Sequence, residues 1–300
     1  MKEYLSIDVG GTYIKYGLID RSGNIKERGQ IPTVHHLSGF IEQLNQLILQ
    51  RKERIRAVTI SCPGKINAQT GVVYFGGALD FLNKFAMKAH VEKLIEQTCL
   101  VINDGKAAAL SELWLGNLKG VTNGLCLTLG TGIGGGIILN EQLFEGSHFQ
   151  SGEVSFMIDR QNKQGIQKVA AEDGSAVGFI QQANRLLQTD DLLDGRRVFE
   201  ALEKGNPLIY PLFETFCRQI ATTIINTQTI LDMECVVIGG GISAQPRVIQ
   251  EITKQYHRLR DSFPMMRDSL IALEIKPCFF RNDANLLGAL YYYLETLADE

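Results

Sequence analysis

Two segments of the chain place alternating apolar and polar residues on both sides of a glycine turn. Residues 4–20 read YLSIDVGGTYIKYGLID, and residues 125–139 read LCLTLGTGIGGGIIL. This pattern is typical of two antiparallel strands joined by a tight turn. Because the pattern occurs twice, we expect one supersecondary unit to be used once in each of two domains. The sequence therefore predicts a bilobal protein with a cleft.

Strand and helix patterns alternate between these two hairpins. Strands are predicted over 55–61 and 99–102, and helices over 38–51, 87–97 and 106–115. This alternation predicts an α/β fold. After the second hairpin the pattern is mainly helical until a strand over 235–238, which a run of three glycines interrupts.

The domain boundary is predicted near Gly116, where the helix over 106–115 ends. We expect an N-terminal α/β domain over 1–116 and a larger C-terminal α/β domain over 117–285. The segment 286–300, which reads as a helix as far as residue 297, is expected to pack back against the first domain.

The composition is that of a folded globular protein. Of the 300 residues, 45% are hydrophobic and 21% are charged, which excludes disordered and fibrous classes. The net charge is −3 and no basic block is present, so nucleic-acid binding has no electrostatic support. We find no signal-peptide layout and no apolar stretch of membrane-spanning length. We therefore expect a cytoplasmic protein that binds neither nucleic acid nor membranes.

The cysteines are scattered without any C-x-x-C pair, most of them in apolar segments. They are Cys62, Cys99, Cys126, Cys217, Cys235 and Cys278. This pattern predicts buried, reduced thiols, with neither disulfides nor zinc.

The first glycine turn places a carboxylate, Asp8, at the end of a strand and next to bare backbone amides. Gly10, Gly11 and Thr12 follow it. Amides without a neighbouring Cβ can approach an oxyanion, so the turn fits a phosphate cradle. A tight hairpin that uses glycine for positive φ explains the same residues.

The second and third glycine turns have different surroundings. The run from Gly130 to Gly136 lies in a strand context, where glycine costs backbone entropy without a packing return, which favours a functional role. It lacks the Lys-Ser/Thr ending of a P-loop and precedes a strand, so neither Walker nor Rossmann patterns fit. Gly239, Gly240 and Gly241 follow a strand and offer bare backbone for an adenine or a ribose; a plain strand-to-helix turn is the alternative.

Asn103 and Asp104 lie where the strand over 99–102 gives way to a helix. Asp104 is therefore a candidate N-cap. A carboxylate at the carboxyl end of a strand is also placed to accept a hydroxyl proton during phosphoryl transfer. The two interpretations do not exclude one another.

The ordered set of these motifs resembles the ROK family of sugar kinases and repressors over nearly the whole chain. Further matching segments are Cys62-Pro63-Gly64, Ala107-Ala108-Ala109, Gly152-Glu153, Asn282-Asp283-Ala284 and Gly288-Ala289. The resemblance implies an actin-like ATPase (ribonuclease H-like) fold with two domains flanking a cleft, and usually a homodimer. Many family repressors carry a helix-turn-helix ahead of the first hairpin; here the hairpin starts within a few residues of Met1.

The resemblance also implies ATP with Mg²⁺ as cofactors, Asp104 as catalytic base and a sugar as the partner. The predicted substrate-binding residues are Asn103, Glu153, Asp80 and Phe156. The predicted ATP- and phosphate-binding residues are Asp8, Gly10, Gly11, Thr12, Lys15, Gly130, Thr131, Gly132, Gly134, Gly239, Gly240 and Gly241. Asp8 is expected to hold Mg²⁺ through a water molecule.

The chain departs from the family pattern in four places. The family's zinc cluster falls on residues 159–169, which contain no cysteine, so we expect no zinc site. Phe156 stands where the family has a histidine. The usual glutamate after the last zinc cysteine aligns with Val169, although Glu172 lies close enough for a shifted replacement. Gly105-Lys106 replaces the usual Ala-Asn, and Lys106 contacts either phosphate or solvent.

These departures bear on the sugar. Without the groups that hold a free C1 hydroxyl, a sugar substituted at C1 loses less on binding than free glucose does. Phe156 either packs against a second sugar ring or fills the core. We therefore hypothesise phosphorylation of the 6-hydroxyl of a β-glucoside such as cellobiose. The alternatives are a kinase for glucose, fructose or an N-acetylhexosamine, a non-catalytic sugar-binding protein, and a hydrolytic ATPase of the actin or chaperone type.

Overall fold

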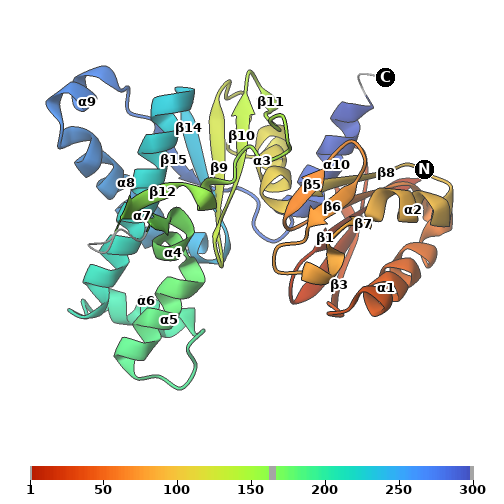
Figure 1. Ribbon diagram of the computed structural model, residues 1–300, viewed down its shortest axis with the longest axis horizontal. Coiled ribbons are helices and arrows are strands. Elements are labelled where there is room, and N and C mark those ends of the chain that lie inside the picture. Colours follow the sequence, from red (N-terminus) through yellow and green to blue (C-terminus); the bar gives the residue numbers. More distant parts are fainter. Residues whose placement is uncertain (1, 162–166, 298–300) are drawn as a thin grey trace. The chain divides into compact units, whose positions relative to one another are not determined.

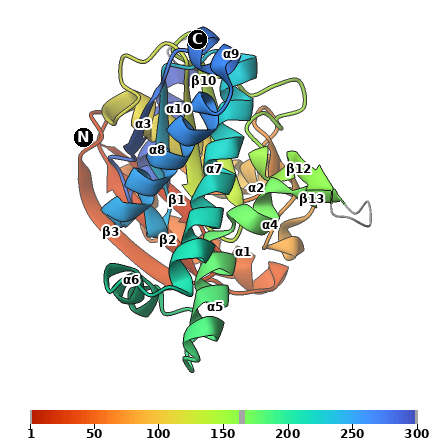
Figure 2. The same ribbon diagram turned by 90° about the vertical axis from the view of Figure 1, so that its left-hand side faces the viewer.

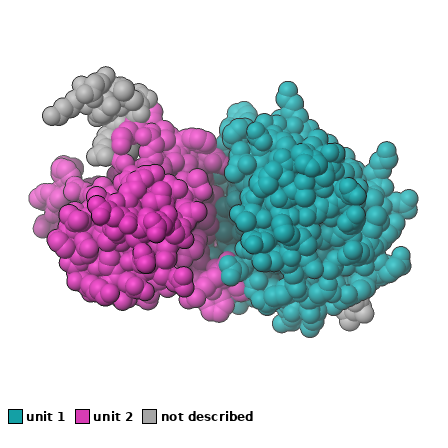
Figure 3. Space-filling model, turned by 90° about the horizontal axis from the view of Figure 1, so that it is seen from below, with its two compact units in different colours: residues 1–119, 143–151, 282–300 teal, residues 120–142, 152–281 magenta. Residues whose placement is uncertain are grey.

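The computed structural model describes residues 2–161 and 167–297 and divides the chain into two compact units (Figure 1). Unit 1 comprises residues 1–119, 143–151 and 282–300, and unit 2 comprises residues 120–142 and 152–281. Figure 3 shows unit 1 in teal and unit 2 in magenta.

Unit 1 is built on a five-stranded sheet with the order β3-β2-β1-β4-β8. Its first three strands are antiparallel neighbours, and β4 and β8 continue the sheet in parallel with β1. The strands are β1 (Glu3–Val9), β2 (Tyr13–Ile19), β3 (Ile25–Pro32), β4 (Ile55–Cys62) and β8 (Cys99–Asn103). The helices are α1 (Leu37–Leu49), α2 (Met87–Ile95), α3 (Asp104–Leu115) and α10 (Ala284–Thr296), with short 3₁₀ turns at η1 (Lys52–Arg54) and η2 (Asp80–Leu82). A small sheet contains β5 (Lys65–Asn67), β6 (Val72–Phe75) and β7 (Phe85–Ala86).

The burial pattern explains the order of these strands. β4 lies between β1 and β8 and is buried almost throughout, as expected of a parallel strand covered on both faces. β3 lies at the edge and alternates between partly buried and exposed residues. Strand β1 divides its side chains: Leu5 and Ile7 join the core that contains Phe40 of α1. Ser6, of the opposite face, donates a 2.6 Å hydrogen bond to the carbonyl oxygen of Leu286 in α10.

Unit 2 repeats the topology, with the sheet order β11-β10-β9-β14-β15. β10 is antiparallel to β9, and β14 and β15 continue in parallel. The strands are β9 (Gly124–Leu129), β10 (Ile133–Leu139), β11 (Gln142–Leu143), β14 (Cys235–Gly239) and β15 (Glu274–Pro277), with a separate hairpin of β12 (Ile158–Gln161) and β13 (Gln167–Val169). The repeat confirms the prediction that one supersecondary unit is used twice.

The helices of unit 2 pack around α7, a 23-residue helix that runs along this unit in Figure 2. Phe213 and Phe216 of α7 lie in the core, and the ring of Phe216 stacks on that of Phe179 with 5.1 Å between centroids. The helices and 3₁₀ turns are η3 (Val154–Phe156), α4 (Ala170–Gly174), α5 (Ala176–Leu187), α6 (Gly195–Glu203), α7 (Ile209–Leu231), η4 (Gly241–Ala244), α8 (Pro246–Asp261) and α9 (Pro264–Ser269).

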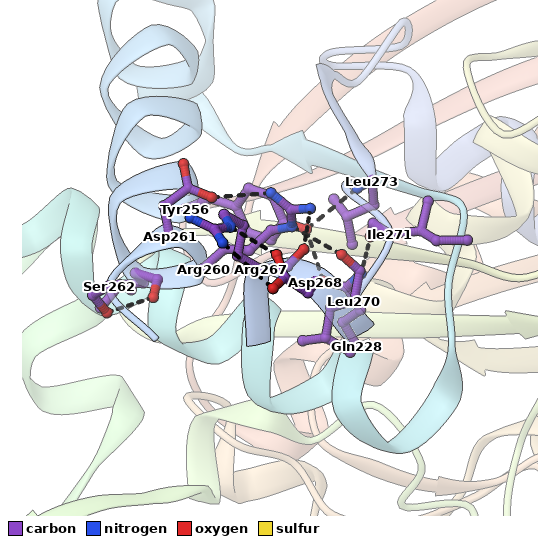
Figure 4. Close-up of polar contacts among 11 residues, drawn as sticks. Gln228, Tyr256, Arg260, Asp261, Ser262, Arg267, Asp268, Leu270, Ile271 and Leu273 are labelled. Atoms are coloured by element: carbon purple, nitrogen blue, oxygen red, sulfur yellow. Dashed lines mark hydrogen bonds and ion pairs between the residues drawn. The ribbon is translucent and has the colours of Figure 1, made fainter. Parts of the chain in front are cut away.

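A polar network fixes the return of the chain from α8 to β15 (Figure 4). The buried hydroxyl of Tyr256 donates to Oε1 of Gln228 at 2.8 Å and accepts from the amide of Leu273 at 3.2 Å. The guanidinium of Arg260 donates to the carbonyl oxygen of Leu270 at 2.9 Å. Because buried polar groups need partners, this network pins the start of β15 beside β14.

The structure differs from the sequence-based expectations in three ways. Short strands, β3, β5 to β7 and β15, were not predicted, and the β12–β13 hairpin lies in a stretch expected to be mainly helical. Segment 143–151 belongs to unit 1, whereas a continuous second domain over 117–285 was expected. Helix α3 begins at Asp104, two residues before the predicted start. Within residues 2–161 and 167–297, no helix is both long enough and apolar enough to cross a bilayer.

Candidate functional site

The carboxyl ends of three parallel strands of unit 1 gather polar residues at one edge of the sheet. In the strand register Asp8 of β1 is opposite Ser61 of β4, and Cys62 is opposite Asn103 of β8. Asp104 follows directly as the first residue of α3. Carboxyl ends of parallel strands are where open α/β sheets bind ligands.

Asp8 is held in a fixed orientation. Its side chain is buried, with 8% exposed, and its Oδ1 accepts hydrogen bonds from Ser61 Oγ at 2.8 Å and from Asn285 Nδ2 at 2.9 Å. Lys15 of β2 is its direct cross-strand neighbour. A carboxylate oriented in this way, beside a glycine turn, fits the oxygen donor that Mg²⁺ prefers and suits a contact through water.

Asn103, and not Asp104, is the N-cap of α3. Its Oδ1 accepts from the amide of Lys106 at 3.1 Å, and its Nδ2 donates to the carbonyl oxygen of Gly64 at 3.0 Å. The N-cap interpretation of Asp104 is therefore wrong. Oδ1 of Asp104 accepts from the amide of Gly105 at 2.8 Å, at the positive end of the helix, where a carboxylate is stabilised.

The pKa of the buried Cys62 thiol is affected by the negative charges at this edge of the sheet. Burial raises the pKa of Cys62, and the carboxylates of Asp104 and Asp8 raise it further. Both carboxylates therefore lie close enough to act on one side chain at the end of β4. The structure brings together two acids that are far apart in the sequence.

Asp80 lies in a turn that packs against Gly64, the residue whose carbonyl oxygen accepts from Asn103. It is exposed and opens η2, and this turn is closed by the amide of Leu79, which donates to the carbonyl oxygen of Gly76 at 3.0 Å. Gly64, whose carbonyl accepts from Asn103, has φ +92°, and a Cβ there would collide with the carbonyl oxygen of Phe75. The turn and the cap of α3 are thus joined through Gly64.

The first glycine turn contains one glycine that the fold requires and one that it does not. The amide of Gly10 donates to the carbonyl oxygen of Tyr13 at 3.0 Å, and a Cβ on Gly10 would lie 2.9 Å from that oxygen. A Cβ on Gly11 would meet nothing within 4 Å. Thr12 is exposed beside it. Within the described residues, the space next to Gly11 is therefore open.

The second glycine turn, in unit 2, also contains glycines that close packing requires and one that it does not require. A Cβ on Gly130 would meet nothing within 4 Å, and Thr131 is exposed. A Cβ on Gly132 would lie 3.0 Å from Ser155 Oγ, and one on Gly134 would collide with Thr128 Oγ1. Close packing therefore explains Gly134 without a ligand, contrary to the expectation that this run has no packing return.

The third glycine turn lies beside the second, since Gly239 pairs with Thr128 across β14 and β9. Gly240 has φ +90°, and a Cβ there would collide with the carbonyl oxygen of Leu129. A Cβ on Gly239 would approach Cys278 Sγ at 3.0 Å. Gly241, in contrast, faces open space, with nothing within 4 Å of a Cβ.

Gly130 and Gly241 both line a cavity of about 580 Å³ inside unit 2. Its wall is largely apolar, and a few polar side chains join it. The apolar lining residues are Leu129, Ala176, Val177, Ile180, Leu193, Phe199 and Ile242, and the polar side chains are Asp191, Asp194, Arg196 and Gln245. An apolar concave site with a few polar groups is the usual form of a small-molecule or nucleotide-base pocket.

Glu153 and Phe156 lie at the ends of the short turn η3 in unit 2. Ser155, between them, fixes this turn to the second glycine hairpin: its Oγ accepts from the amide of Ile133 at 2.8 Å and donates to the carbonyl of Ile133 at 2.9 Å. Phe156 is 66% exposed, so the core-filling interpretation of this residue is wrong. An exposed aromatic ring is free to pack against a ligand.

Glu172 lies in the first turn of α4, where its Oε1 accepts from the amide of Val169 at 3.4 Å. This contact gives Glu172 a role at the helix N-terminus. The expected lack of a zinc site concerns residues 159–169, of which 162–166 lie outside the described residues.

Sequence reasoning missed several residues of these sites. Ser61 and Asn285 orient Asp8. Asn285 directly follows a recognised motif, Asn282-Asp283-Ala284, which was the available signal. The residues that line the cavity, on α5, α6 and the loop before α6, carry no local pattern that distinguishes them from core residues.

The chain is similar in sequence to known proteins over almost its full length. The sequence model of the ROK family matches residues 4–296. The chain is 29% identical over 296 residues to "Beta-glucoside kinase" of Listeria innocua, with 97% of each chain covered. It is 28% identical over 305 residues to "N-acetylmannosamine kinase" of Haemophilus influenzae, with 99% of this chain and 97% of the relative covered.

Among solved structures, a ROK family protein from Streptococcus pneumoniae in complex with sucrose matches with a TM-score of 0.88 and 26% identity. The match covers 99% of this chain and 100% of that one. These similarities confirm the predicted actin-like ATPase fold.

Proposed function

The chain belongs to the ROK family, and we propose that it is an ATP-dependent kinase that phosphorylates the 6-hydroxyl of a β-glucoside such as cellobiose. Three glycines carry the proposal. Among the residues that the structure describes, none lies within 4 Å of a Cβ built on Gly11, Gly130 or Gly241, and the φ angles of these glycines lie outside the positive range that favours glycine. The fold does not require glycine there. Open space beside backbone amides is what phosphate groups need for close approach.

Unit 2 supports nucleotide binding by itself. The cavity of about 580 Å³ has the size and the apolar wall suited to a purine base, and it begins at Gly130 and Gly241. A base lying there would place its phosphates next to the bare backbone of the two turns. Mg²⁺, when bound with the nucleotide, would neutralise charge on the transferred phosphoryl group, and Asp8 is the residue suited to hold it.

Unit 1 supports the acid–base chemistry. In the proposed reaction, the carboxylate of Asp104 accepts the proton of the attacking sugar hydroxyl, the hydroxyl oxygen bonds to the γ-phosphorus, and ADP leaves. Asn103, fixed by its bonds to Lys106 and Gly64, would orient a neighbouring hydroxyl. Positioning and electrostatics would supply most of the rate enhancement.

Two observations favour a β-glucoside. Phe156 exposes an apolar ring where family members have a histidine, so a free C1 hydroxyl would lack that partner, whereas a second sugar ring would gain a surface. A protein named beta-glucoside kinase is among the relatives that match over almost the full length. A relative named N-acetylmannosamine kinase, at nearly the same identity, makes a monosaccharide kinase the second candidate.

A coupled assay of ADP release tests both candidates. Mg-ATP would be offered with cellobiose, gentiobiose, glucose, fructose, N-acetylmannosamine and N-acetylglucosamine, and with no sugar. Higher kcat/KM for the β-linked disaccharides would support the proposal. A preference for a free hexose or N-acetylhexosamine would keep the kinase and exclude the β-glucoside. ADP release at the same rate without sugar would contradict a sugar kinase.

A further inference from the structure

Lys106 is a buried lysine in the first turn of α3, two residues after Asp104. Only 2% of it is exposed. Its Nζ donates to the carbonyl oxygen of Phe149 at 3.1 Å and lies 3.4 Å from that of Glu145. Both carbonyls belong to segment 143–151, which unit 1 takes from the middle of the chain. In the structure this ammonium is therefore bonded to the backbone of a distant segment of the chain.

Segment 143–151 is folded around this contact. The carbonyl oxygen of Glu145 also accepts from the amide of Ser151 at 3.3 Å, so the two ends of the segment are joined. Gly146 has φ +74°, and Phe149 has φ +56°. A bulky residue in the left-handed region costs about 1 kcal/mol or more and persists only where its surroundings impose it. The bond from Lys106 to Phe149 is such a constraint.

The charge of Lys106 makes the contact strong. An ammonium removed from water is stable only when acceptors replace its hydration, and hydrogen bonds from a charged donor are about twice as strong as neutral ones. Burial raises the pKa of the Glu145 side chain, and Lys106 acts in the opposite direction, which places the two side chains near each other. The ammonium therefore organises the backbone of the segment, and its charge also acts on the Glu145 carboxyl.

We propose that Lys106 is a positioning residue that fixes segment 143–151, and through it the start of the sugar-binding stretch Gly152-Glu153. This inference rests on the proposed function. Glu153 follows the segment by two residues, so the conformation of Ser151 sets where the chain enters η3. The turn of α3 that carries the base Asp104 also carries this support. The first turn of α3 thereby carries both the proposed base, Asp104, and the lysine that supports the loop leading to Glu153, the proposed sugar-binding residue.

Lys106→Met tests the proposal, because it keeps an unbranched apolar stem and removes the ammonium. We expect hydrogen exchange of the amides in 143–151 to become at least about tenfold faster. We expect KM for the sugar to rise about tenfold, while KM for ATP stays within about twofold. Lys119→Met is the matched control, since Lys119 is an exposed lysine of the same unit just beyond the other end of α3. It should change none of these quantities.

Gly146→Ala tests the same coupling from the side of the loop and leaves the buried lysine intact. An alanine at φ +74° is strained, and its Cβ would lie 3.3 Å from that of Ser151. We expect the same rise in sugar KM, and a double variant that is no worse than Lys106→Met alone, because both changes release one segment. If Lys106→Met does not fold, Gly146→Ala still tests whether the conformation of segment 143–151 affects sugar binding.

Two results would overturn the proposed positioning role of Lys106. One is unchanged hydrogen exchange of the amides in 143–151 in folded Lys106→Met, and the other is an equal loss of ATP and sugar binding in both variants. The exchange measurement needs no activity. A wild-type protein without sugar-dependent ADP release would therefore refute the proposed function. Faster hydrogen exchange in Lys106→Met would still support the inference that Lys106 fixes segment 143–151.

Discussion

Nδ2 of Asn285 donates a 2.9 Å hydrogen bond to Oδ1 of Asp8, although 277 positions separate the two residues. Ser61 donates to the same oxygen at 2.8 Å. A residue of α10 and a residue of β4 therefore fix the rotation of this carboxylate. Because two separate donors converge on one oxygen, the orientation of Asp8 depends on both ends of the chain.

We expect Asn285→Ala to raise the Mg²⁺ concentration for half-maximal activity about fivefold, since one net hydrogen bond is worth about 1 kcal/mol. A Mg²⁺ titration at fixed sugar would measure this. Asn45→Ala, which removes a partner of His90 in the same unit, is the control and should leave the Mg²⁺ requirement unchanged. An unchanged Mg²⁺ requirement in Asn285→Ala would contradict a role of Asp8 in holding Mg²⁺.

Asp104→Asn should lower kcat by about 10²- to 10⁴-fold, the usual contribution of a general base. The asparagine Oδ1 can still accept from the amide of Gly105, so we expect the melting temperature and the Kd for ATP to change little. Isothermal titration and a thermal scan would check the two controls. Turnover equal to that of the wild type would remove Asp104 as the base.

Gly241→Ala and Gly240→Ala should separate ligand binding from folding. Gly241 faces open space, so its alanine variant should fold with an unchanged melting temperature but bind ATP at least about tenfold more weakly. Gly240 has φ +90° and packs on the carbonyl of Leu129, so its alanine variant should lose about 1–3 kcal/mol of stability. Tight ATP binding by Gly241→Ala would show that no nucleotide approaches this turn.

Phe156→His should change the choice of sugar and leave the fold intact, because the side chain is 66% exposed. We expect the ratio of kcat/KM for cellobiose to that for glucose to fall about tenfold, as the apolar contact is replaced by a polar partner. Phe263→His, at another exposed phenylalanine, is the control. An equal ratio in wild type and Phe156→His would exclude Phe156 from sugar selection.

Asp20 should make stability depend on pH at the acid end. Burial acts to raise its pKa, but hydrogen bonds from Asn24, Lys26 and the amide of Ser22 outweigh this and lower it to about 2. Its folded pKa lies below the unfolded value of 3.8, so its contribution is present above pH 3.8 and is lost as pH falls toward 2.

Because Asp20 is partly exposed, with 30% of its side chain accessible, solvent screening limits its contribution to about 1 kcal/mol. Urea unfolding of the wild type and Asp20→Asn at pH 6 and at pH 3 would measure it. The difference between the two proteins should be smaller at pH 3. A difference that is the same at both pH values would mean that Asp20 is not stabilised in its charged form.

The hairpins and the buried parallel strands could be predicted because their patterns are local. Alternation around a glycine turn identified β1 with β2 and β9 with β10, and short, mainly apolar runs identified β4 and β8. β15 has a weak pattern, and it pairs only because β14 is already in place. Such short edge strands depend on tertiary context more than on their own residues.

The site residues could be predicted only as far as chemistry shows in the sequence. Asn103 and Asp104 are adjacent and both suit an N-cap, and only the backbone geometry assigns the cap to Asn103. Gly130 and Gly134 read alike in the sequence, yet one faces open space and the other packs on Thr128. The sequence leaves Lys106 open between a contact with phosphate and one with solvent, and its burial follows from a segment about forty positions away that folds onto α3.

The helix α10 has a consequence for how the protein is made. It covers the sheet of unit 1 through Ser6 and Leu286, and Gly288 packs directly on the carbonyl of Ala107. Yet residues 282–300 are translated after all of unit 2. At ordinary elongation rates the first sheet emerges from the ribosome and waits roughly 8 to 30 s for its covering helix. During that interval the face of the sheet that carries Ser6 lacks its covering helix, so the native packing of unit 1 is completed only when the end of the chain has been made.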